Sequence, residues 1–382
     1  MVRVNRDSLW RQGLLVVGLV WLIASCVSAK KWPPSENGQP LEWSYPQSVG
    51  PFEMSPRGPQ AIEKHPSLVA LAYYGFSNNP SDSMATSPEL FRRQVAYLEV
   101  QSFGFMNLKH WLPTKSRLSE DRQILITIEG WSSESDSLLQ ETLDKKIPVV
   151  LFLNSLDLKN SEAISFVQRQ AQNPLLSVGL RGTGMAKSIN EELHQLADLT
   201  GSRVSLFSYP VSSDPRPIKV DLQSAGITLA LTHLSGAIGS ESDPLLWPRF
   251  PINNHHGQLL GPQKNGFEIR AFSLPMDLTS LEDKNFLQTN RLFIGITTQI
   301  HDARRLNCFF NGSPVARIMR TAQHKHFPAS MKNWGHRYEL SLKEKPEGPP
   351  LLRCTLLAQP GSKSQPPRFH WGTVQLPSAK RD

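Results

Sequence analysis

Cysteine is scarce in this sequence, with only Cys26, Cys308 and Cys354 among 382 residues. Long apolar runs are missing too, because the most apolar segment, Gly13 to Ser25, is short for a membrane-spanning helix. No block of Lys and Arg interleaved with aromatic residues accompanies the net charge of +8, which excludes the usual signature of nucleic-acid binding. The absence of a Ser-His-Asp nucleophile elbow, a phosphate-binding loop and a dinucleotide-binding fingerprint excludes the enzymes built on those motifs.

The N-terminus has the organisation of an export signal. Basic residues precede the apolar segment, and residues 1–29 therefore form a predicted signal peptide or lipoprotein signal. Val27-Ser28-Ala29 fits cleavage by an ordinary signal peptidase, whereas Ile23-Ala24-Ser25-Cys26 resembles a bacterial lipobox with Cys26 as the lipidated residue. An uncleaved anchor is the third alternative. We favour the lipoprotein, which predicts an exported protein of the bacterial periplasm or outer surface, held at the membrane.

The two remaining cysteines support export. If Cys26 is lipidated or removed, Cys308 and Cys354 form an even pair, which in an oxidising compartment favours a disulfide. Each lies in a short strand-like run, so the sequence predicts two strands joined by this bond. Two buried free thiols are the alternative.

The rest of the chain divides into three parts. Residues 30–66 are rich in Pro, Ser, Gly and Glu and form a predicted tether. In residues 67–260, short apolar runs alternate with helical segments, which predicts a parallel barrel or an open α/β sheet. Strand-like runs separated by Gly, Pro, Asn and Ser fill residues 261–382 and predict an antiparallel β-sandwich.

The individual elements follow from the same patterns. The strands expected in residues 67–260 are Val69–Tyr73, Phe103–Leu108, Ile124–Ile128, Val149–Leu153, Leu175–Leu180, Val204–Ser208 and Ile227–Thr232. The expected helices are Pro88–Gln101, Glu134–Lys146, Glu162–Gln172 and Ile189–Thr200. The expected C-terminal strands are Phe267–Phe272, Arg291–Thr298, Leu306–Phe310, Arg317–Met319, Tyr338–Leu342, Leu351–Leu357 and Phe369–Val374.

One predicted strand end carries the clearest chemical signal. Thr127-Ile128-Glu129-Gly130-Trp131 follows an apolar run and precedes a polar stretch, so Glu129 is expected where α/β folds place their functional groups. The segment resembles the first motif of the polysaccharide deacetylases, the NodB-homology family, in which the strand ends in Thr-Phe-Asp-Asp-Gly. In that family the first carboxylate is the base and the second binds a divalent metal. Here Glu129 keeps the first carboxylate, and Gly130 replaces the second.

Further segments resemble the same family in the same order. Tyr74 follows a strand that usually ends in Tyr-His, and Ser87–Phe91 is similar to the family's Ser-Pro-Glu-x-Phe start of a helix. Leu206–Pro210 resembles its Tyr-Pro loop, without the usual Arg, and Pro248–Ile252 resembles its closing Arg-x-Pro segment. The resemblance runs from about residue 68 to about residue 252 and implies an α/β fold with a distorted (β/α)7 barrel.

The resemblance also implies that the metal site is lost. Residues 181–185 correspond to the family's second motif, His-Ser/Thr-x-x-His, with Arg181 and Met185 at the two histidine positions. A hydrolytic zinc ion needs imidazole and carboxylate ligands, whereas Gly130 has no side chain, Arg181 is a fixed cation and Met185 is a soft thioether. We therefore expect no cofactor, and a divalent metal such as zinc only in a divergent deacetylase.

Several residues are candidates for the site itself. Glu129 is a weak candidate for a general base, or else a hydrogen-bonding group in a sugar groove. Arg181 either forms an ion pair with Glu129 in place of the metal or binds an anionic sugar or phosphate. The pairs His255-His256 and His324/His326 are expected to be solvated rather than metal-binding. Stacking faces for sugar rings are expected from Tyr74, Trp111, Trp131 and Tyr209, with ordinary loop aromatics as the alternative.

These features predict a catalytically inactive polysaccharide deacetylase-like protein that binds or helps to process a cell-envelope or extracellular polysaccharide. Its expected partners are the polysaccharide, the membrane through the N-terminal anchor, and a protein of polysaccharide synthesis or export; nucleic acid is not expected. A divergent carbohydrate N-deacetylase or esterase is the first alternative. A structural envelope protein is the second.

Overall fold

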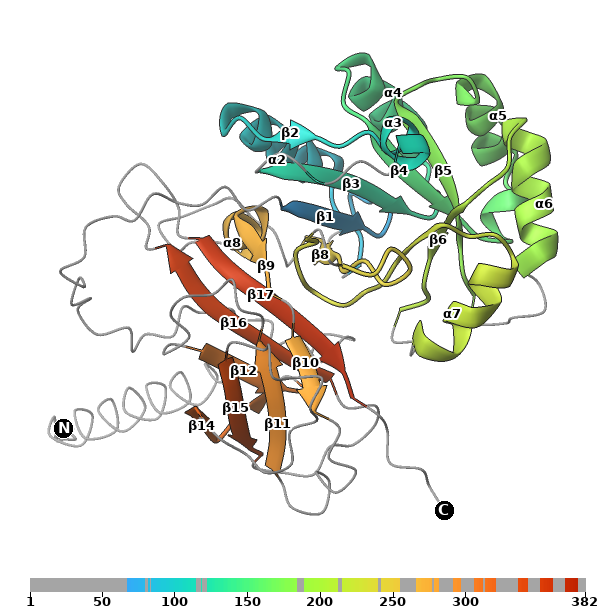
Figure 1. The fold of residues 1–382 in the computed structure, drawn as a ribbon. Coiled ribbons are helices and arrows are strands. Elements are labelled where there is room, and N and C mark those ends of the chain that lie inside the picture. Colours follow the sequence, from blue (N-terminus) through green and yellow to red (C-terminus); the bar gives the residue numbers. More distant parts are fainter. Residues whose placement is uncertain are drawn as a thin grey trace, which may run out of the picture.

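A computed structural model describes residues 67–79, 82, 84–114, 118, 122–183, 189–211, 215–239, 242–254, 266–276, 278–281, 291–296, 306–311, 313–320, 336–342, 351–359 and 368–376. The predicted signal, the tether and Cys26 lie outside these residues, as do Met185 and both histidine pairs. No helix within the described ranges is long and apolar enough to cross a membrane. Figure 1 shows a unit with parallel strands and helices beside a unit made mainly of antiparallel strands.

The first unit is a parallel sheet bent into a half-barrel, with helices along its outer side (Figure 1). The strand order is β7-β6-β5-β4-β3-β1-β8, with the short β2 beside β3. This order confirms the predicted distorted (β/α)7 barrel. The strands are β1 (Leu68–Tyr73), β2 (Gly104–Phe105), β3 (Gln123–Glu129), β4 (Val149–Leu153), β5 (Leu176–Arg181), β6 (Leu206–Ser208), β7 (Leu229–Leu231) and β8 (Phe250–Ile252).

The helices of this unit begin and end at local signals in the sequence. Ser87 Oγ accepts a hydrogen bond from Leu90 N at 3.2 Å before the first helix, where Pro88 occupies the first turn. Gly201, with φ +64°, follows α6 in a left-handed conformation that glycine adopts without strain. The helices are α2 (Pro88–Val100), α3 (Leu108–Thr114), α4 (Ser135–Asp144), η1 (Asp157–Lys159), α5 (Ser161–Gln170), α6 (Ile189–Thr200) and α7 (Pro215–Ser224).

The segment before β8 narrows the gap between the two edge strands. Leu231 at the end of β7 forms a parallel bridge with Trp247, and Thr232 N donates to the Trp247 carbonyl at 2.7 Å. The chain then pairs with β1 through Phe250–Ile252. Trp247 contacts the edge strand β7, and Phe250–Ile252 form the other edge strand, β8. Arg249, which lies between these two contacts in the chain, is therefore placed between the two edges of the half-barrel.

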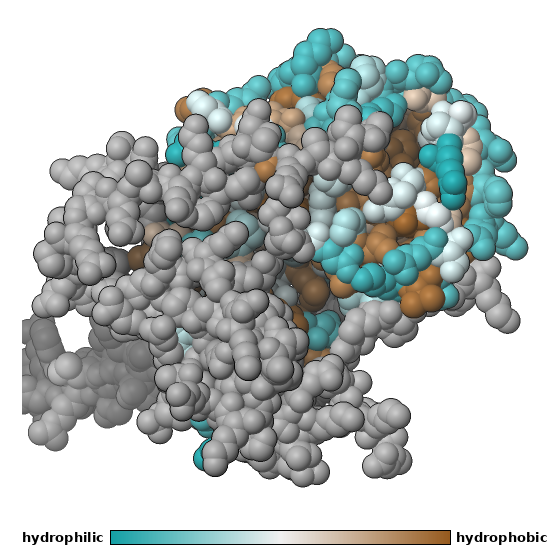
Figure 2. All heavy atoms as spheres, in the orientation of Figure 1, coloured by the Kyte–Doolittle hydropathy of each residue, from teal (hydrophilic) through white to brown (hydrophobic). Residues whose placement is uncertain are grey.

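Alternation along the strands separates two apolar clusters. One fills the barrel interior and includes Leu125, Phe152 and Leu206. The other lies between strands and helices and includes Ile126 and Phe166. Since successive strand residues point to opposite faces, Glu129 shares its face with Leu125, on the interior side. Figure 2 shows mostly hydrophilic residues around the outer rim near α4, α5 and α6, as expected of amphipathic helices.

The second unit consists of two β-sheets, which confirms the predicted sandwich. One sheet has the order β10-β11-β15-β14 and the other β13-β12-β16-β17-β9. All neighbouring strands are antiparallel except β9, which runs parallel to β17. The strands are β9 (Ser273–Pro275), β10 (Leu278–Leu281), β11 (Arg291–Ile296), β12 (Leu306–Phe310), β13 (Ser313–Pro314), β14 (Arg317–Arg320), β15 (His336–Ser341), β16 (Leu351–Gln359) and β17 (Arg368–Gln375).

The predicted disulfide is present in this sandwich. Cys308 and Cys354 are directly opposite each other on β12 and β16, with a sulfur–sulfur distance of 2.09 Å. Both residues are buried in the apolar cluster between the sheets, together with Ile294 and Leu352. The bond therefore joins two neighbouring strands of one sheet, on the face that is buried in the core of the small unit.

The two units share part of their core. Trp371 of β17 belongs to the outer cluster of the barrel and meets Phe250 of β8 edge to face, with ring centroids 5.0 Å apart. Thr373 Oγ1 donates to the carbonyl of Ser235, which follows β7. The sandwich is thus packed onto the half-barrel beside its edge strands.

Two predicted elements need correction, and two helices were not predicted. Phe267–Phe272 is not a strand; residues 266–271 form helix α8 (Gly266–Ala271). Phe267 and Ala271 are four positions apart, so a helix places both in the outer cluster of the barrel. The run Phe103–Leu108 gives only the short β2 before α3 begins, and the sequence patterns missed both α3 and α7.

Candidate functional site

Polar side chains gather where the parallel strands of the barrel end. Glu129, Arg181 and Ser208 are the last residues of β3, β5 and β6, and all three point into the barrel interior. Tyr74 follows β1, and His233 lies two residues after β7. Because parallel strands end at one edge, residues far apart in sequence meet there. We call this group, together with Arg249, Asp157 and Trp131, the mouth.

Glu129 is the centre of the mouth. Its side chain is fully buried, and its Oε1 accepts a hydrogen bond from Ser208 Oγ at 2.7 Å and a second from Arg249 Nη1. Its Oε2 faces Arg181 Nε at 3.3 Å, an ion pair that the sequence raised as one alternative. Arg181 is 30% exposed, so Glu129 lies beneath a partly solvated guanidinium group.

Arg249 is the principal partner of Glu129. Its side chain is fully buried, and its three nitrogens donate to different elements of the barrel. Nε donates to the Thr232 carbonyl at 3.0 Å, Nη1 to Thr127 Oγ1 at 3.2 Å as well as to Glu129, and Nη2 to Ser208 Oγ at 2.8 Å. A buried ion pair is stable only with this degree of hydrogen bonding, because desolvation of both charges is costly.

The surroundings keep Glu129 ionised. Burial by itself would raise the pKa of this carboxyl, but the charges of Arg249 and Arg181 and the hydrogen bond from Ser208 hold the pKa below its ordinary value. The carboxylate therefore has little tendency to take up a proton near neutral pH.

His233 bridges Tyr74 and the backbone beside Arg249. Its Nε2 lies 2.5 Å from the Tyr209 carbonyl, which can only accept, so Nε2 carries the proton. Tyr74 Oη then donates to Nδ1 at 2.5 Å, and the two rings stack with centroids 5.5 Å apart. Burial, reinforced by the charge of Arg249, lowers the pKa of His233 to about 4, so its imidazole is neutral at pH 7.

A turn with a required glycine shapes the rim next to Glu129. Gly130 has φ +80°, and a Cβ atom there would lie 3.1 Å from Arg181 Nη1. Asp157 at the start of η1 fixes this turn, because its Oδ1 accepts from Trp131 N at 3.1 Å and its Oδ2 from Asn154 N at 2.9 Å. Arg181 therefore occupies the space above Gly130.

These residues do not fit a catalytic metal. Gly130 provides no ligand, and the guanidinium of Arg181 fills the adjacent space and faces the carboxylate of Glu129. A divalent cation next to Glu129 would meet the positive charges of both Arg181 and Arg249. Across the described residues no group of three His, Cys, Asp or Glu could hold a metal ion. The residue at the second family histidine position, Met185, lies outside them.

The four aromatic candidates lie in different places. Tyr74 and Trp131 are half-buried at the mouth, where Trp131 packs on Phe166 with ring centroids 5.2 Å apart. Tyr209 is only 1% exposed and its hydroxyl donates to the Leu245 carbonyl at 3.0 Å, so its ring is not open for stacking.

Trp111 lies at the opposite end of the barrel from the mouth. Lys109 of the same helix, α3, donates to the Asn173 carbonyl at 2.7 Å, just before β5 begins, and the Trp111 ring packs on Trp247 5.0 Å away. Trp111 therefore does not lie with Glu129 at the mouth, and its role as a stacking face for sugar stays a prediction.

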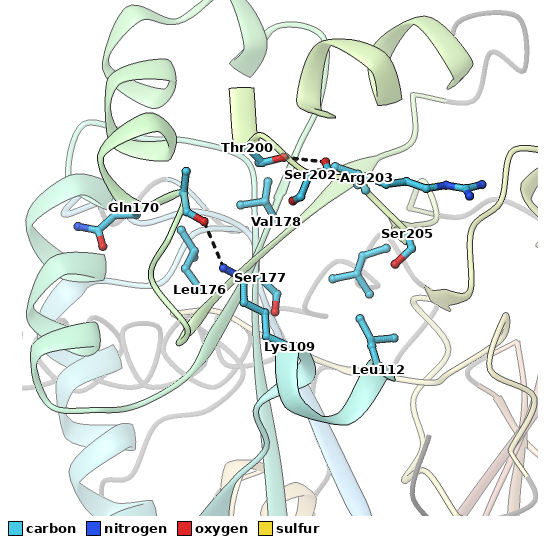
Figure 3. A pocket seen from close by; sticks show the side chains of 13 residues that line it. Lys109, Leu112, Gln170, Leu176, Ser177, Val178, Thr200, Ser202, Arg203 and Ser205 are labelled. Carbon is cyan, nitrogen blue, oxygen red and sulfur yellow. Dashed lines mark hydrogen bonds between the residues drawn. The ribbon is translucent and has the colours of Figure 1, made fainter. Parts of the chain in front are cut away.

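A hollow occurs at that opposite end. It has a volume of about 120 Å³ and is lined from the starts of β5 and β6, from α3 and from the chain after α6 (Figure 3). Lys109 and Arg203 contribute charge, and Ser177 and Ser205 contribute hydroxyl groups. This hollow is separated from Glu129 by the length of the strands.

Sequence reasoning missed His233, Asp157 and Ser208 as members of the site and used Arg249 only as part of a family segment. One signal was available for His233 and Ser208, because both follow or end a short apolar run in the way that Glu129 does. Arg249 has no comparable local signal, since its position depends on the bridge between Trp247 and β7.

No protein-family model matches the sequence, and comparison with curated proteins finds no match. Among solved structures, the chain is similar to a polysaccharide deacetylase from Bacillus cereus, with 12% identity, a TM-score of 0.42, and coverage of 48% of this chain and 64% of that one. It is similar also to IcaB from Ammonifex degensii (18% identity, TM-score 0.42, 50% and 94% coverage) and to PplD, a deacetylase from Streptococcus pyogenes (12%, 0.43, 50% and 93%). The chain thus spans about two thirds of the Bacillus cereus protein.

Proposed function

We propose that this protein is a non-catalytic relative of the polysaccharide deacetylases and binds a polysaccharide at the mouth of its barrel. The observation that carries the proposal is the state of Glu129, which is fully buried and paired with Arg249 and Arg181. A general base needs a lone pair within reach of its substrate and a pKa near the working pH. Glu129 is instead held as an anion beneath two guanidinium groups.

The polysaccharide part of the proposal rests on the order of family-like segments in the sequence and on the mouth itself. The Glu129 segment ends a central strand of a half-barrel of the expected type. Trp131 and Tyr74 follow the ends of β3 and β1 and are half-buried, the first packed on Phe166 and the second stacked on His233. Rings of this kind suit the apolar faces of sugars. The proposal requires no metal and no cofactor.

The proposal places the protein outside the cytoplasm, anchored to the membrane through a lipid on Cys26. The disulfide between Cys308 and Cys354 supports an oxidising compartment. A protein of polysaccharide synthesis or export is the partner that such a location would bring within reach.

A divergent deacetylase is the alternative favoured by one observation. Glu129 and His233 lie in one buried site on either side of Arg249, which donates to Glu129 Oε1 through Nη1 and has Nη2 3.5 Å from His233 Nε2 without a hydrogen bond between these two donors. A carboxylate and an imidazole in one site are the usual means of proton transfer. This alternative requires Arg181 and Arg249 to release Glu129.

Acetate release and glycan binding, measured on the same protein, separate these functions. We expect no acetate release from N-acetylchitotetraose, with or without added Zn²⁺, above the level of a Glu129→Gln variant. We expect the same oligosaccharide, or an acidic one, to bind, and Trp131→Ala to weaken that binding about tenfold through loss of a stacking face. Trp111→Ala, at the other end of the barrel, is the matched control and should leave binding unchanged. Acetate release that Glu129→Gln abolishes would show that the protein is an enzyme.

A further inference from the structure

Arg181 is the charged residue of the mouth with the most unused binding capacity. Its Nε faces Glu129 Oε2, and the described residues place no hydrogen-bond acceptor on Nη1 or Nη2. Its side chain is 30% exposed, whereas all three nitrogens of the fully buried Arg249 have partners. A guanidinium group has five N–H donors, and among the described residues only the Nε–H of Arg181 faces an acceptor, so its Nη1 and Nη2 groups are the ones that a ligand would use.

Within the group of Glu129, Arg249 and Arg181, the charge of Arg181 is in surplus. Arg249 and Glu129 form a buried pair of opposite charges, and Ser208 completes the hydrogen bonding of Glu129 Oε1. His233, with a pKa of about 4, adds no charge at neutral pH. Glu129, Arg249 and Arg181 together carry one net positive charge, and the carboxylate of Asp157, on the other side of the Gly130 turn, brings the net charge of the mouth to zero. Arg181 is the member of the Glu129 group whose side chain is partly exposed.

The neighbouring groups restrict what can approach that edge. Asp157 is the nearest further acid, and both of its oxygens already accept backbone N–H groups. Its carboxylate flanks Gly130, on the side where Arg181 Nη1 lies, so an anion must approach Arg181 from the side away from Asp157. Two buried polar atoms of the mouth make no hydrogen bond in the part of the chain that the structure describes, the donor Trp131 Nε1 and the acceptor Glu129 Oε2. Because Glu129 Oε2 faces Arg181 Nε, the polar group at the mouth that a ligand can reach is the partly exposed guanidinium of Arg181.

We propose that Arg181 binds the carboxylate of a uronic acid, so that the polysaccharide held at the mouth is an acidic one. This inference rests on the proposed function, because it names the class of glycan for the same site. The planar fork of a guanidinium group matches a planar carboxylate in two parallel hydrogen bonds.

Titration calorimetry with tetragalacturonate tests the assignment on the full chain. We expect Arg181→Gln to weaken binding by at least about tenfold, the scale expected for charged hydrogen bonds. Arg181→Lys keeps the charge without the fork and should fall between Arg181→Gln and the wild type. Arg203→Gln removes a cation at the opposite end of the barrel and should bind like the wild type. The affinity of the wild type should also fall as the salt concentration rises.

Three results would overturn the inference. Equal affinity of the wild type and Arg181→Gln for tetragalacturonate would show that Arg181 makes no contact, provided that both proteins unfold at the same temperature. If Arg181→Gln does not fold, equal affinity of Arg181→Lys and the wild type, at every salt concentration, is the corresponding result. Tighter binding of inorganic phosphate than of tetragalacturonate would replace the uronate with a phosphate group.

A neutral glycan separates this inference from the proposed function. If N-acetylchitotetraose binds as tightly as tetragalacturonate, with no acetate released, the preference for acidic sugar is wrong while the binding function stands. If acetate is released and Arg181→Gln still weakens tetragalacturonate binding, the binding function alone is insufficient while the role of Arg181 stands.

Discussion

Glu129 is a fully buried carboxylate that its neighbours in the barrel keep ionised. Glu129 is the last residue of β3 and points into the barrel interior. There Arg249 forms an ion pair with it, and Ser208 donates a further hydrogen bond. Arg181 faces the same carboxylate but remains partly exposed, so the two arginines have different roles. Arg249 contributes to stability, and Arg181 is available for a ligand.

This difference predicts unequal effects of two matching substitutions. Arg249→Met leaves Glu129 buried without its main partner, and we expect a loss of about 3–5 kcal/mol in the free energy of unfolding. Arg181→Met removes a partly solvated partner and should cost about 1 kcal/mol or less. Urea unfolding of the two variants beside the wild type measures both values. Equal losses would contradict the assignment of Arg249 as the principal partner.

At the scale of elements, residues that are distant in sequence meet at the site because the parallel strands end at the same edge of the sheet. Arg249 and Glu129 are 120 positions apart, and β3, β5, β6 and the segment before β8 bring their side chains together. The turn after β3 is tight, because Gly130 adopts φ +80° and Arg181 Nη1 occupies the space above it. The turn after β3 and the side chain of Arg181, at the end of β5, therefore constrain each other's position.

Comparing Gly75 with Gly130 distinguishes the effect of a left-handed backbone from the effect of contact with Arg181. Gly75 after β1 has φ +82° and no atom within 4 Å of a Cβ, whereas Gly130 has nearly the same φ and a close guanidinium. We expect each substitution by Ala to cost about 1–2 kcal/mol through the left-handed backbone. Gly130→Ala alone should also displace Arg181 and weaken tetragalacturonate binding. Unfolding and binding measurements on both variants check this, and an equal effect of Gly75→Ala on binding would refute it.

The whole molecule joins two units through one shared patch of core. Trp371 of the sandwich packs on Phe250 of the barrel, next to the segment that carries Arg249. The disulfide between Cys308 and Cys354 lies inside the sandwich and closes a loop with a sequence separation of 46. Unfolding of the sandwich would therefore remove the contact of Trp371 with Phe250 and destabilise the edge strand β8 of the barrel.

Loss of the disulfide should therefore be felt in both units. Closing a loop of this length stabilises a fold by roughly 3–4 kcal/mol in the chain-entropy model. We expect Cys354→Ser to lower the unfolding temperature of the sandwich strongly, and that of the barrel by a smaller amount through the contact between Trp371 and Phe250. Thermal unfolding followed by Trp fluorescence measures this. Purified Cys26→Ser, which keeps the pair, is the control, and two reactive thiols in the unreduced wild type would contradict the prediction.

The sequence by itself determined most of the elements of the barrel and the place of its main carboxylate. Apolar runs predicted the positions of the long strands, such as Val149–Leu153, because alternation and burial are local properties. The run before Glu129 likewise placed this residue at a strand end. Cysteine parity, once Cys26 is lipidated or removed, favoured the bond between Cys308 and Cys354 over two free thiols, and the bond is present. Local patterns failed for Phe267–Phe272, where a short apolar run fits a helix and a strand equally well.

Only the tertiary structure decided how Glu129 is used. Nothing local to Arg249 marks it as the partner of Glu129, since the bridge between Trp247 and β7 places it between the barrel edges. The same holds for the aromatic candidates, because the end of the barrel at which Trp111 lies depends on the packing of α3, and the burial of Tyr209 depends on its bond to Leu245. Periodicity specifies which face a side chain occupies, whereas contacts across the barrel depend on how distant segments pack together.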